Sequence, residues 1–323
     1  MLRTGPRLLS VAVLLSAVLA RPAVAVRLET GRTVELGRLP TSLTPLPDGS
    51  VAVALSGEKA ILILAGDTLE TLRRIDLSES HGVNALVAVG EDELLVAHGA
   101  GDSVSFVSWR DGTVRATAEV GLQPGLAAVT TGKKGLKVHV PGHLSHDLAE
   151  VSVRHGVLVE RIRVGRNPTV AIASPDERFV FVACGASRKI DQVDLKYDVV
   201  LGSFGVPLIE STPLLINQAG TILYAIGEKN RILKIGTERG RHSKMKVGKD
   251  PSALALSDDD RTLFVGLDEG RGIDVLNLVT GKVGQQLRGG TPVDVLMRQG
   301  DRLLALSRSE GVLTAHVIVG AGS

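Results

Sequence analysis

The sequence predicts an all-β protein, a seven-bladed β-propeller whose four-stranded blades are arranged in a ring. Three observations lead to this prediction. A Gly-x-x-Pro pattern recurs about every 42 residues over most of the 323-residue chain. Short runs of alternating apolar residues follow each copy, and residues that favour tight turns separate these runs. Four strands in about 40 residues are the unit of a propeller blade, so seven such units predict seven blades.

The Gly-x-x-Pro pattern marks the start of each unit. It occurs at residues 37–40, 121–124, 165–168, 248–251 and 289–292, with a degenerate copy at 82–85 and another near 208–211 that is inferred from the run TILYAIG after it. The fourth positions, 40, 85, 124, 168, 211, 251 and 292, are separated by 45, 39, 44, 43, 40 and 41 residues. Such regular spacing indicates that one supersecondary unit is repeated along the chain.

Within each unit, a turn separates the first two predicted strands. The apolar runs are short and rich in β-branched residues, and in chain order they include SVAVAL (50–55), KVHV (137–140), FVFVA (179–183), TILYAIG (221–227) and TLFVG (262–266). Period-2 alternation over this length indicates strands. Turns are expected between the first two runs of each unit, at 47–49, 90–92, 132–135, 175–177, 219–220, 258–260 and 300–301.

The last unit lacks one strand, and the beginning of the chain supplies it. Residues 292–319 offer three runs, PVDVLM, DRLLAL and GVLTAHVIV. The segment LETGRTVEL (28–36) echoes LVTGKVGQQL (278–287) at the end of the sixth unit. We therefore expect residues 26–36 to form the outer strand of the seventh blade, which closes the ring and removes exposed sheet edges. Residues 26–323 then form one domain.

Two of the units resemble a known repeat. The runs VGRNPTVAIASPDERFVFVACGASRKIDQVDL (164–195) and VGKDPSALALSDDDRTLFVGLDEGRGIDVLNLVTGKV (247–283) are similar to the YVTN-type β-propeller repeat of exported bacterial proteins. Phe181 and Cys184 stand where that repeat has Tyr and Asn. The resemblance implies the propeller fold. Relatives include surface proteins, lactonase-like proteins and partners of redox enzymes, so the repeat implies no single activity.

The first 25 residues have the features of an export signal. Arg3 and Arg7 precede an apolar run over 8–20, and the small-x-small sequence AVA follows at 23–25, as before a signal-peptidase cut. The apolar run is shorter than the roughly 20 residues that span a bilayer, so no transmembrane anchor is expected after cleavage. We therefore predict a periplasmic or secreted protein with residues 1–25 as its signal peptide.

Charge and motif content restrict the partners. The chain has 37 Lys and Arg against 35 Asp and Glu, and removing residues 1–25 with their three Arg leaves 34 against 35. Nucleic-acid binding normally needs a basic excess, so no nucleic acid is expected. The single Cys184 allows no intrachain disulfide. Haem-attachment, nucleophile-elbow and phosphate-loop motifs are absent from the sequence, so no cofactor is predicted.

Propellers tend to bind ligands where loops surround the central funnel. If the topology of the repeat family holds, the loops before the first strands and the loops between the second and third strands share one face. The side chains expected to contact a partner there are His81, His98, Asp102, Arg166, Arg188, Lys229, Arg231 and Asp268. The same loops carry Glu58, His143, His146, Asn167, Cys184, Lys249, Asp250 and Arg271. The alternative interpretation is that these are ordinary solvated loop residues of both charges.

A metal site is a further hypothesis. The segment HVPGHLSHD (139–147) places three His and one Asp within nine residues, and neutral imidazole is a good ligand for zinc or copper. The hypothesis is that His143, His146 and Asp147 hold a divalent metal ion. Against this hypothesis, the spacing matches no standard site, and His139 alternates with two Val on a predicted strand.

His98 and Cys184 raise the question of a catalytic pair, because they occupy equivalent positions in VAHG and VACG. A nucleophile and its base must be within roughly 2.6–3.2 Å of each other. Two blades separate these positions, so a buried structural thiol is the alternative interpretation of Cys184.

The sequence favours binding over catalysis. The leading hypothesis is a non-catalytic binding or scaffold protein of the cell envelope that holds a protein or polymer through one loop face. One alternative is a lactonase-like hydrolase with general acid–base groups in the central funnel. Another is an accessory subunit of a periplasmic redox enzyme.

Overall fold

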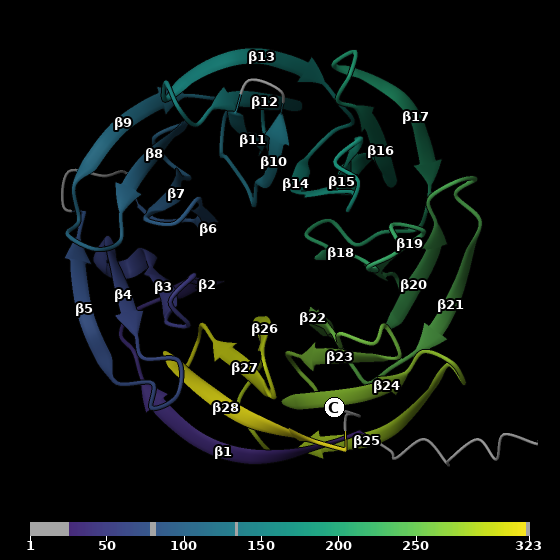
Figure 1. Cartoon of the computed structure of the whole chain (residues 1–323). Coiled ribbons are helices and arrows are strands. Elements are labelled where there is room, and N and C mark those ends of the chain that lie inside the picture. Colours follow the sequence, from purple (N-terminus) through teal and green to yellow (C-terminus); the bar gives the residue numbers. More distant parts are fainter. Residues whose placement is uncertain (1–25, 78–81, 133–134, 321–323) are drawn as a thin grey trace, which may run out of the picture.

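The computed structural model describes residues 26–77, 82–132 and 135–320. In these residues, strands β1 to β28 form seven four-stranded antiparallel sheets arranged as a ring around a central axis (Figure 1). The helical elements of this described part are two short 3-10 turns, η1 (Ser56–Glu58) and η2 (Gly185–Ser187). The predicted all-β, seven-bladed propeller is therefore confirmed.

The first three blades are meanders that run from the channel outward. Blade 1 contains β2 (Pro40–Pro45), β3 (Val51–Leu55), β4 (Ala60–Leu64) and β5 (Thr71–Asp76). Blade 2 contains β6 (Ala85–Val89), β7 (Glu93–His98), β8 (Ser103–Ser108) and β9 (Val114–Glu119). Blade 3 contains β10 (Ala128–Gly132), β11 (Gly135–Gly142), β12 (Asp147–Ser152) and β13 (Val157–Arg163).

The next three blades follow the same plan. Blade 4 contains β14 (Pro168–Ala173), β15 (Phe179–Cys184), β16 (Lys189–Asp194) and β17 (Val199–Gly205). Blade 5 contains β18 (Leu214–Ile216), β19 (Ile222–Gly227), β20 (Arg231–Gly236) and β21 (His242–Lys246). Blade 6 contains β22 (Pro251–Leu256), β23 (Thr262–Leu267), β24 (Gly272–Asn277) and β25 (Lys282–Arg288).

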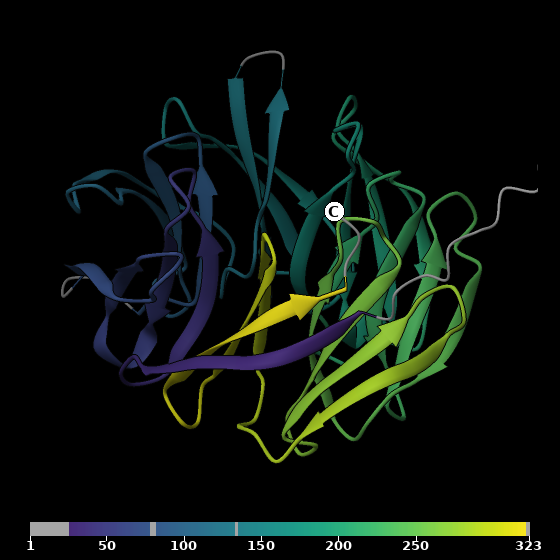
Figure 2. The ribbon, with the colours of Figure 1, turned by 60° about the horizontal axis from the view of Figure 1, so that its bottom comes forward.

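Blade 7 combines the two ends of the described chain. Its inner strands are β26 (Val295–Gln299), β27 (Arg302–Ser307) and β28 (Val312–Val319), and its outer strand is β1 (Arg27–Glu35). β1 runs antiparallel to β28, from the pair Arg27–Val319 to the pair Glu35–Val312, and the two strands lie side by side in Figure 2. The predicted closure of the ring by residues 26–36 is confirmed.

The apolar cores lie between blades. Successive side chains of a strand point to opposite faces of its sheet, so each middle strand packs against both neighbouring blades. In β15, Val180 and Val182 pack toward blade 3, whereas Phe181 and Ala183 pack toward blade 5. Seven such clusters occur in the described residues, one for each pair of adjacent blades.

The structure corrects the alignment of the second repeat. In blade 1, Ser42 pairs with Ala54 and lies two residues after the repeat Pro. The equivalent pair in blade 2 is Ala85–Ala97. Val83, rather than Ala85, therefore holds the Pro position of that unit.

Candidate functional site at the mouth of the central channel

Two sets of loops share one face of the ring. The loops before the inner strands contact the loops between the second and third strands. For example, the backbone N–H of Gly185 donates to the carbonyl of Asn167 (3.2 Å), and that of Asp268 to the carbonyl of Asp250 (2.9 Å). We call this the Gly-x-x-Pro face. The β10–β11 hairpin projects from the opposite face, toward the top of Figure 2.

The central channel opens on the Gly-x-x-Pro face. It encloses about 410 Å³ and is lined by residues from all seven blades. Leu43, Leu214, Leu254 and Leu296 give it apolar walls, while Asp294 and Arg308 from blade 7 add charge. The backbone N–H of Arg308 donates to Oδ2 of Asp294 (2.8 Å). A mostly apolar hollow with a few polar groups has the character of a ligand site.

Hydrogen bonds link three pairs of adjacent blades around the channel. In blades 1, 2 and 6, the side chain that follows the Pro position donates to the carbonyl at the Pro position of the next blade. Thr41 Oγ1 donates to Val83 O (2.9 Å), and Asn84 Nδ2 donates to Pro124 O (3.0 Å). In blade 3 this position is Gly125, where a Cβ would lie only 2.2 Å from Thr169 O.

Sequence reasoning missed these inter-blade bonds, although their signal is present. In six of the seven blades a polar residue follows the Pro position in the structural alignment: Thr41, Asn84, Thr169, Thr212, Ser252 and Asp294. Small polar side chains at a fixed place in most repeats indicate a structural role, and Thr41, Asn84 and Ser252 have one here.

A side pocket adjoins the channel over blades 2 to 5. It encloses about 430 Å³ and shares Asn84, Gly125, Thr169 and Ser211 with the channel lining. His143 also lines it. In the described structure, Nδ1 of His143 and Oγ1 of Thr169 are buried without a hydrogen-bond partner. Buried polar atoms are normally satisfied, so this pocket suits water or a polar ligand.

The predicted cations on this face fall into two groups. Arg188 of blade 4 forms an ion pair with Glu228 of blade 5. Arg166, Lys229 and Arg231 lie on blades 4 and 5, and among the described residues their side chains have no hydrogen-bond or ion-pair partner. Arg166 and Lys229 are exposed and Arg231 is half-buried. These three side chains remain available to a partner. His81 lies outside the described residues.

Of the two predicted acids on this face, Asp102 is hydrogen-bonded to a neighbouring loop, whereas Asp268 is exposed. Asp102 accepts a hydrogen bond from the backbone N–H of Gln123 (3.0 Å), which braces two loops. Asp268 is exposed on blade 6. Partial burial, followed by the nearby charges of Asp294 and Asp250, raises its pKa. The face therefore has unpaired cations on blades 4 and 5 and an exposed acid, Asp268, on blade 6.

The structure corrects the expectation for His98. Its side chain is only 5% exposed. Nδ1 hydrogen-bonds with Gly82 O, and Nε2 with Ser105 Oγ, both at 2.9 Å. His98 sits at the end of β7, where the strand alternation turns it inward between the loops. Because it is buried and engaged there, it stabilises blade 2 and does not present a side chain to a partner.

Cys184 is buried as well, and iodoacetamide is expected to leave it unmodified in the folded protein. Its side chain is 0% exposed, and Sγ lies 3.8 Å from Oδ2 of Asp191. Burial, together with the negative charge of Asp191, raises the pKa of the thiol to about 12, and only the thiolate is nucleophilic. Mass spectrometry after reaction at pH 8 should show carboxamidomethylation only in denaturant. Rapid labelling without denaturant would contradict the structural role.

The predicted metal ligands have other partners. Asp147 Oδ2 pairs with Nη1 of Arg161 at 2.9 Å. The backbone N–H of Asn167 lies 3.3 Å from Nδ1 of His146 and donates to it. His143 lines the side pocket instead. Within residues 26–77, 82–132 and 135–320, no three His, Cys, Asp or Glu side chains are placed to hold a metal ion, so the metal hypothesis is corrected.

Exposed leucines add an apolar patch that the sequence analysis missed. Leu122 and Leu144 of blade 3 are 46% and 50% exposed. Their loops are joined because the backbone N–H of Leu144 donates to Leu122 O (3.1 Å). Leu39 of blade 1 is 57% exposed on the same face. The sequence did not single out these leucines, because they lie in loops, where the alternation that identifies strand residues does not apply.

No helix among the described residues is long and apolar enough to cross a membrane. Neither a protein family nor a curated protein was found that matches this sequence. Among solved structures, the chain is similar to hydrazine synthase of Kuenenia stuttgartiensis, with a TM-score of 0.76 over 89% of this chain and 98% of that chain. The two sequences are 14% identical, so the likeness shows a shared propeller fold and nothing further.

Proposed function

We propose that this protein is a binding or scaffold protein of the cell envelope that holds a protein partner on its Gly-x-x-Pro face. One observation carries the proposal: exposed leucines on blade 3 lie on the same face as the unpaired cations Arg166, Lys229 and Arg231. Both groups belong to loops around the channel mouth. The export signal expected at residues 1–25 supports a periplasmic or secreted location.

The chemistry of this face suits a protein better than a strongly charged polymer. Protein–protein interfaces typically have an apolar centre and a polar rim, and Arg is enriched in them. The acids on blades 6 and 7, Asp268 and Asp294 among them, would repel a uniformly anionic chain. A partner that presents an apolar side chain to Leu122 and Leu144, and carboxylates to the cations, would be complementary.

Charge reversal on this face is expected to remove the partner. The purified protein would be used to capture proteins from its own cell-envelope extract, and captured proteins would be identified by mass spectrometry. Arg166→Glu combined with Lys229→Glu, and separately Leu122→Ser combined with Leu144→Ser, should each lower the affinity for a stoichiometric partner at least tenfold. Binding should also weaken as salt rises, because exposed charge pairs are screened.

Two substitutions on an outer strand provide the matched control. Leu72 of β5 is 61% exposed and Arg73 beside it is exposed too. Leu72→Ser with Arg73→Glu should leave capture unchanged. Equal loss of binding in the control, or recovery of the propeller alone from the extract, would reject the proposed face.

A further inference from the structure

At one inter-blade position, blade 3 has two ionisable side chains, whereas each of the other six blades has at least one apolar or aromatic side chain. In every blade, the second and third strands contain a cross-strand pair three steps from their hairpin. The seven pairs are Ala52–Ile63, Leu95–Phe106, His139–Glu150, Phe181–Gln192, Tyr224–Lys234, Phe264–Val275 and Leu304–Ala315. Every pair except His139–Glu150 includes an apolar or aromatic side chain.

His139 and Glu150 are both buried, each with 1% exposure. Lys137 Nζ lies 2.5 Å from Glu150 Oε1, and Thr130 Oγ1 lies 2.9 Å from His139 Nε2. The two remaining atoms, His139 Nδ1 and Glu150 Oε2, are 3.9 Å apart and lack hydrogen-bond partners in the described structure. Burying a charge without full compensation destabilises a fold. Two buried ionisable groups in a pair that has an apolar or aromatic member in the six other blades break the pattern of the repeat, and such breaks are expected at functional sites.

These side chains line a cavity of about 620 Å³ between blades 3 and 4, at the end of the blades opposite the Gly-x-x-Pro face. Turns of blade 4, including residues 176–178 and 195–198, form its other wall. Oδ1 of Asp198 is also buried there without a hydrogen-bond partner. The volume lies within the range of small-molecule sites.

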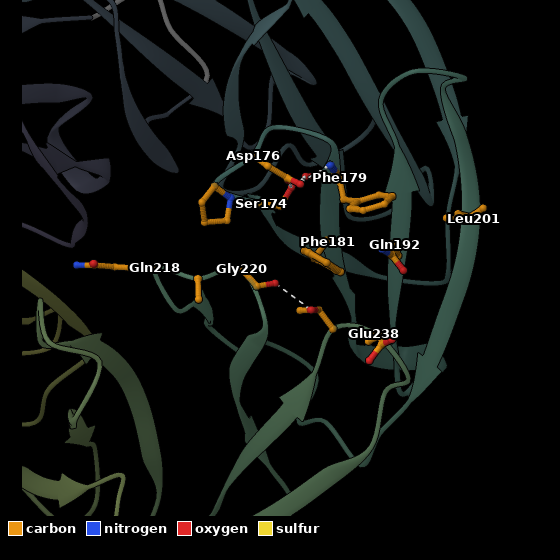
Figure 3. A pocket seen from close by; sticks show the side chains of 12 residues that line it. Ser174, Asp176, Phe179, Phe181, Gln192, Leu201, Gln218, Gly220 and Glu238 are labelled. Atoms are coloured by element: carbon orange, nitrogen blue, oxygen red, sulfur yellow. Dashed lines mark hydrogen bonds between the residues drawn. The ribbon is translucent and has the colours of Figure 1, made fainter.

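The neighbouring interface provides an internal comparison. Figure 3 shows the pocket of about 650 Å³ at the equivalent place between blades 4 and 5. There, Phe179, Phe181 and Gln192 stand where blade 3 has Lys137, His139 and Glu150. The pocket between blades 3 and 4 is thus the same repeat feature with its aromatic wall replaced by ionisable groups.

Two buried carboxylate oxygens of this cavity have no hydrogen-bond donor in the part of the chain that the structure describes. Glu177 Oε2 already accepts from the backbone N–H of Thr131 (2.8 Å), and Asp176 Oδ1 accepts from Ser174 Oγ (2.6 Å). The carboxylate atoms Glu150 Oε2 and Asp198 Oδ1 are left over. His139 Nδ1 lies 3.9 Å from Glu150 Oε2, which is too far for a hydrogen bond whichever tautomer His139 adopts. An occupant that donates hydrogen bonds would therefore satisfy both carboxylate oxygens.

The net charge of the side chains that line the cavity indicates the sign of the charge on the occupant. Four carboxylates, Glu150, Asp176, Glu177 and Asp198, face three cations, Lys137, Arg178 and Lys196. Arg178 and Lys196 also contact the rings of Phe179 and Tyr197. Burial, followed by the charge of Lys137, lowers the pKa of His139 to about 4, so its imidazole is neutral near pH 7. The lining therefore has a formal net charge of −1.

We propose that the cavity between blades 3 and 4 binds a small organic cation, a primary ammonium or guanidinium, whose N–H groups donate to Glu150 and Asp198. A guanidinium or ammonium supplies several donors and the missing positive charge at once. This site is independent of the partner face proposed above, because it lies at the opposite end of the blades.

Calorimetric titration with butylguanidinium and butylammonium tests the proposal, with pentanamide as a neutral probe of similar length. At pH 7 and in 150 mM NaCl, saturable binding of at least one cation to the purified protein is expected, with pentanamide at least tenfold weaker. Each cation that binds should also raise the melting temperature. Glu150→Gln and Asp198→Asn should each weaken binding at least tenfold.

The equivalent pocket supplies the control variant. Glu238 lines the pocket between blades 4 and 5, and Glu238→Gln should leave cation binding unchanged. Asp198→Asn keeps the proposal testable if Glu150→Gln does not fold, because Asp198 lies in a turn and not in the core. Absence of saturable cation binding, equal binding of pentanamide, or unchanged binding in Asp198→Asn would overturn the assignment.

Discussion

A chain without residues 26–36 is expected not to form the folded ring. β1 supplies seven paired residues along β28, and Leu28 is 2% exposed in the core between blades 6 and 7. Gln285 of blade 6 is bonded to both backbone groups of Leu28, through Oε1 (2.7 Å) and Nε2 (3.0 Å). Removing β1 opens this core and exposes β28 as an edge strand, which promotes aggregation. A typical domain is stabilised by only roughly 5–15 kcal/mol, so the loss of a whole strand and the opening of one core are expected to unfold the ring.

Circular dichroism and size-exclusion chromatography would measure this effect. A chain beginning at residue 37 should be aggregated or lack a cooperative melting transition, whereas one beginning at residue 26 should be monodisperse.

The geometry of blade 7 offers a sharp control. Because Arg27 lies opposite Val319, residues 26–36 can be moved to follow residue 320 through a two-residue Asn-Gly turn, which favours a hairpin. This permuted chain should recover the fold. A stable truncated protein, or a permuted chain that fails to fold, would show that β1 does not close the ring.

The sequence predicted the architecture because a propeller is a repeat fold. Each unit buries its apolar faces against its neighbours, so the same pattern of strand, turn and strand must recur. The echo between residues 28–36 and 278–287 was enough to place β1, since an outer strand has the same exposure pattern in every blade. The period of the repeat and the alternation of apolar residues can be read from a single sequence, because both are local properties of the chain.

Register was harder to predict where the marker residue is missing. In blade 7, Val295 pairs with Leu306 as Ser42 pairs with Ala54 in blade 1. Val293 therefore holds the position that the sequence pattern gave to residue 292. Pairing decides the register, and pairing is not visible in a sequence whose repeat has diverged. An error of one residue reverses which side chains face a neighbour.

The candidate site was predicted only in part for the same reason. The loops that share the Gly-x-x-Pro face follow from topology, but the direction of each side chain does not. His98 was expected on the surface and is buried. The exposed Leu122 and Leu144 lie in loops where no periodicity distinguishes them. The His139–Glu150 pair becomes unusual only when strand pairing identifies its six equivalents.

A buried aspartate links the Gly-x-x-Pro loop to the third strand in the two best repeats. In blade 6, Oδ2 of Asp274 accepts from the backbone N–H of Gly248 (2.6 Å), and Oδ1 pairs with Nη2 of Arg288 (2.5 Å). In blade 4, Oδ2 of Asp191 accepts from Gly165 N–H at 2.7 Å. This contact explains why Ile-Asp recurs in these two units, at residues 190–191 and 273–274.

Replacing Asp274 with Ala is expected to lower the free energy of unfolding by roughly 2–3 kcal/mol, because the buried N–H of Gly248 loses its acceptor and a void remains. Arg288 is 37% exposed and can turn to solvent, so its lost ion pair contributes less than a fully buried one would.

Urea denaturation followed by circular dichroism would measure the change. Asp258→Ala is the control, since Asp258 pairs with Arg298 at the surface with 76% exposure, and it should leave stability nearly unchanged. If the two variants were equally stable, the bond to Gly248 would not hold the loop, and the recurrence of Ile-Asp would need another cause.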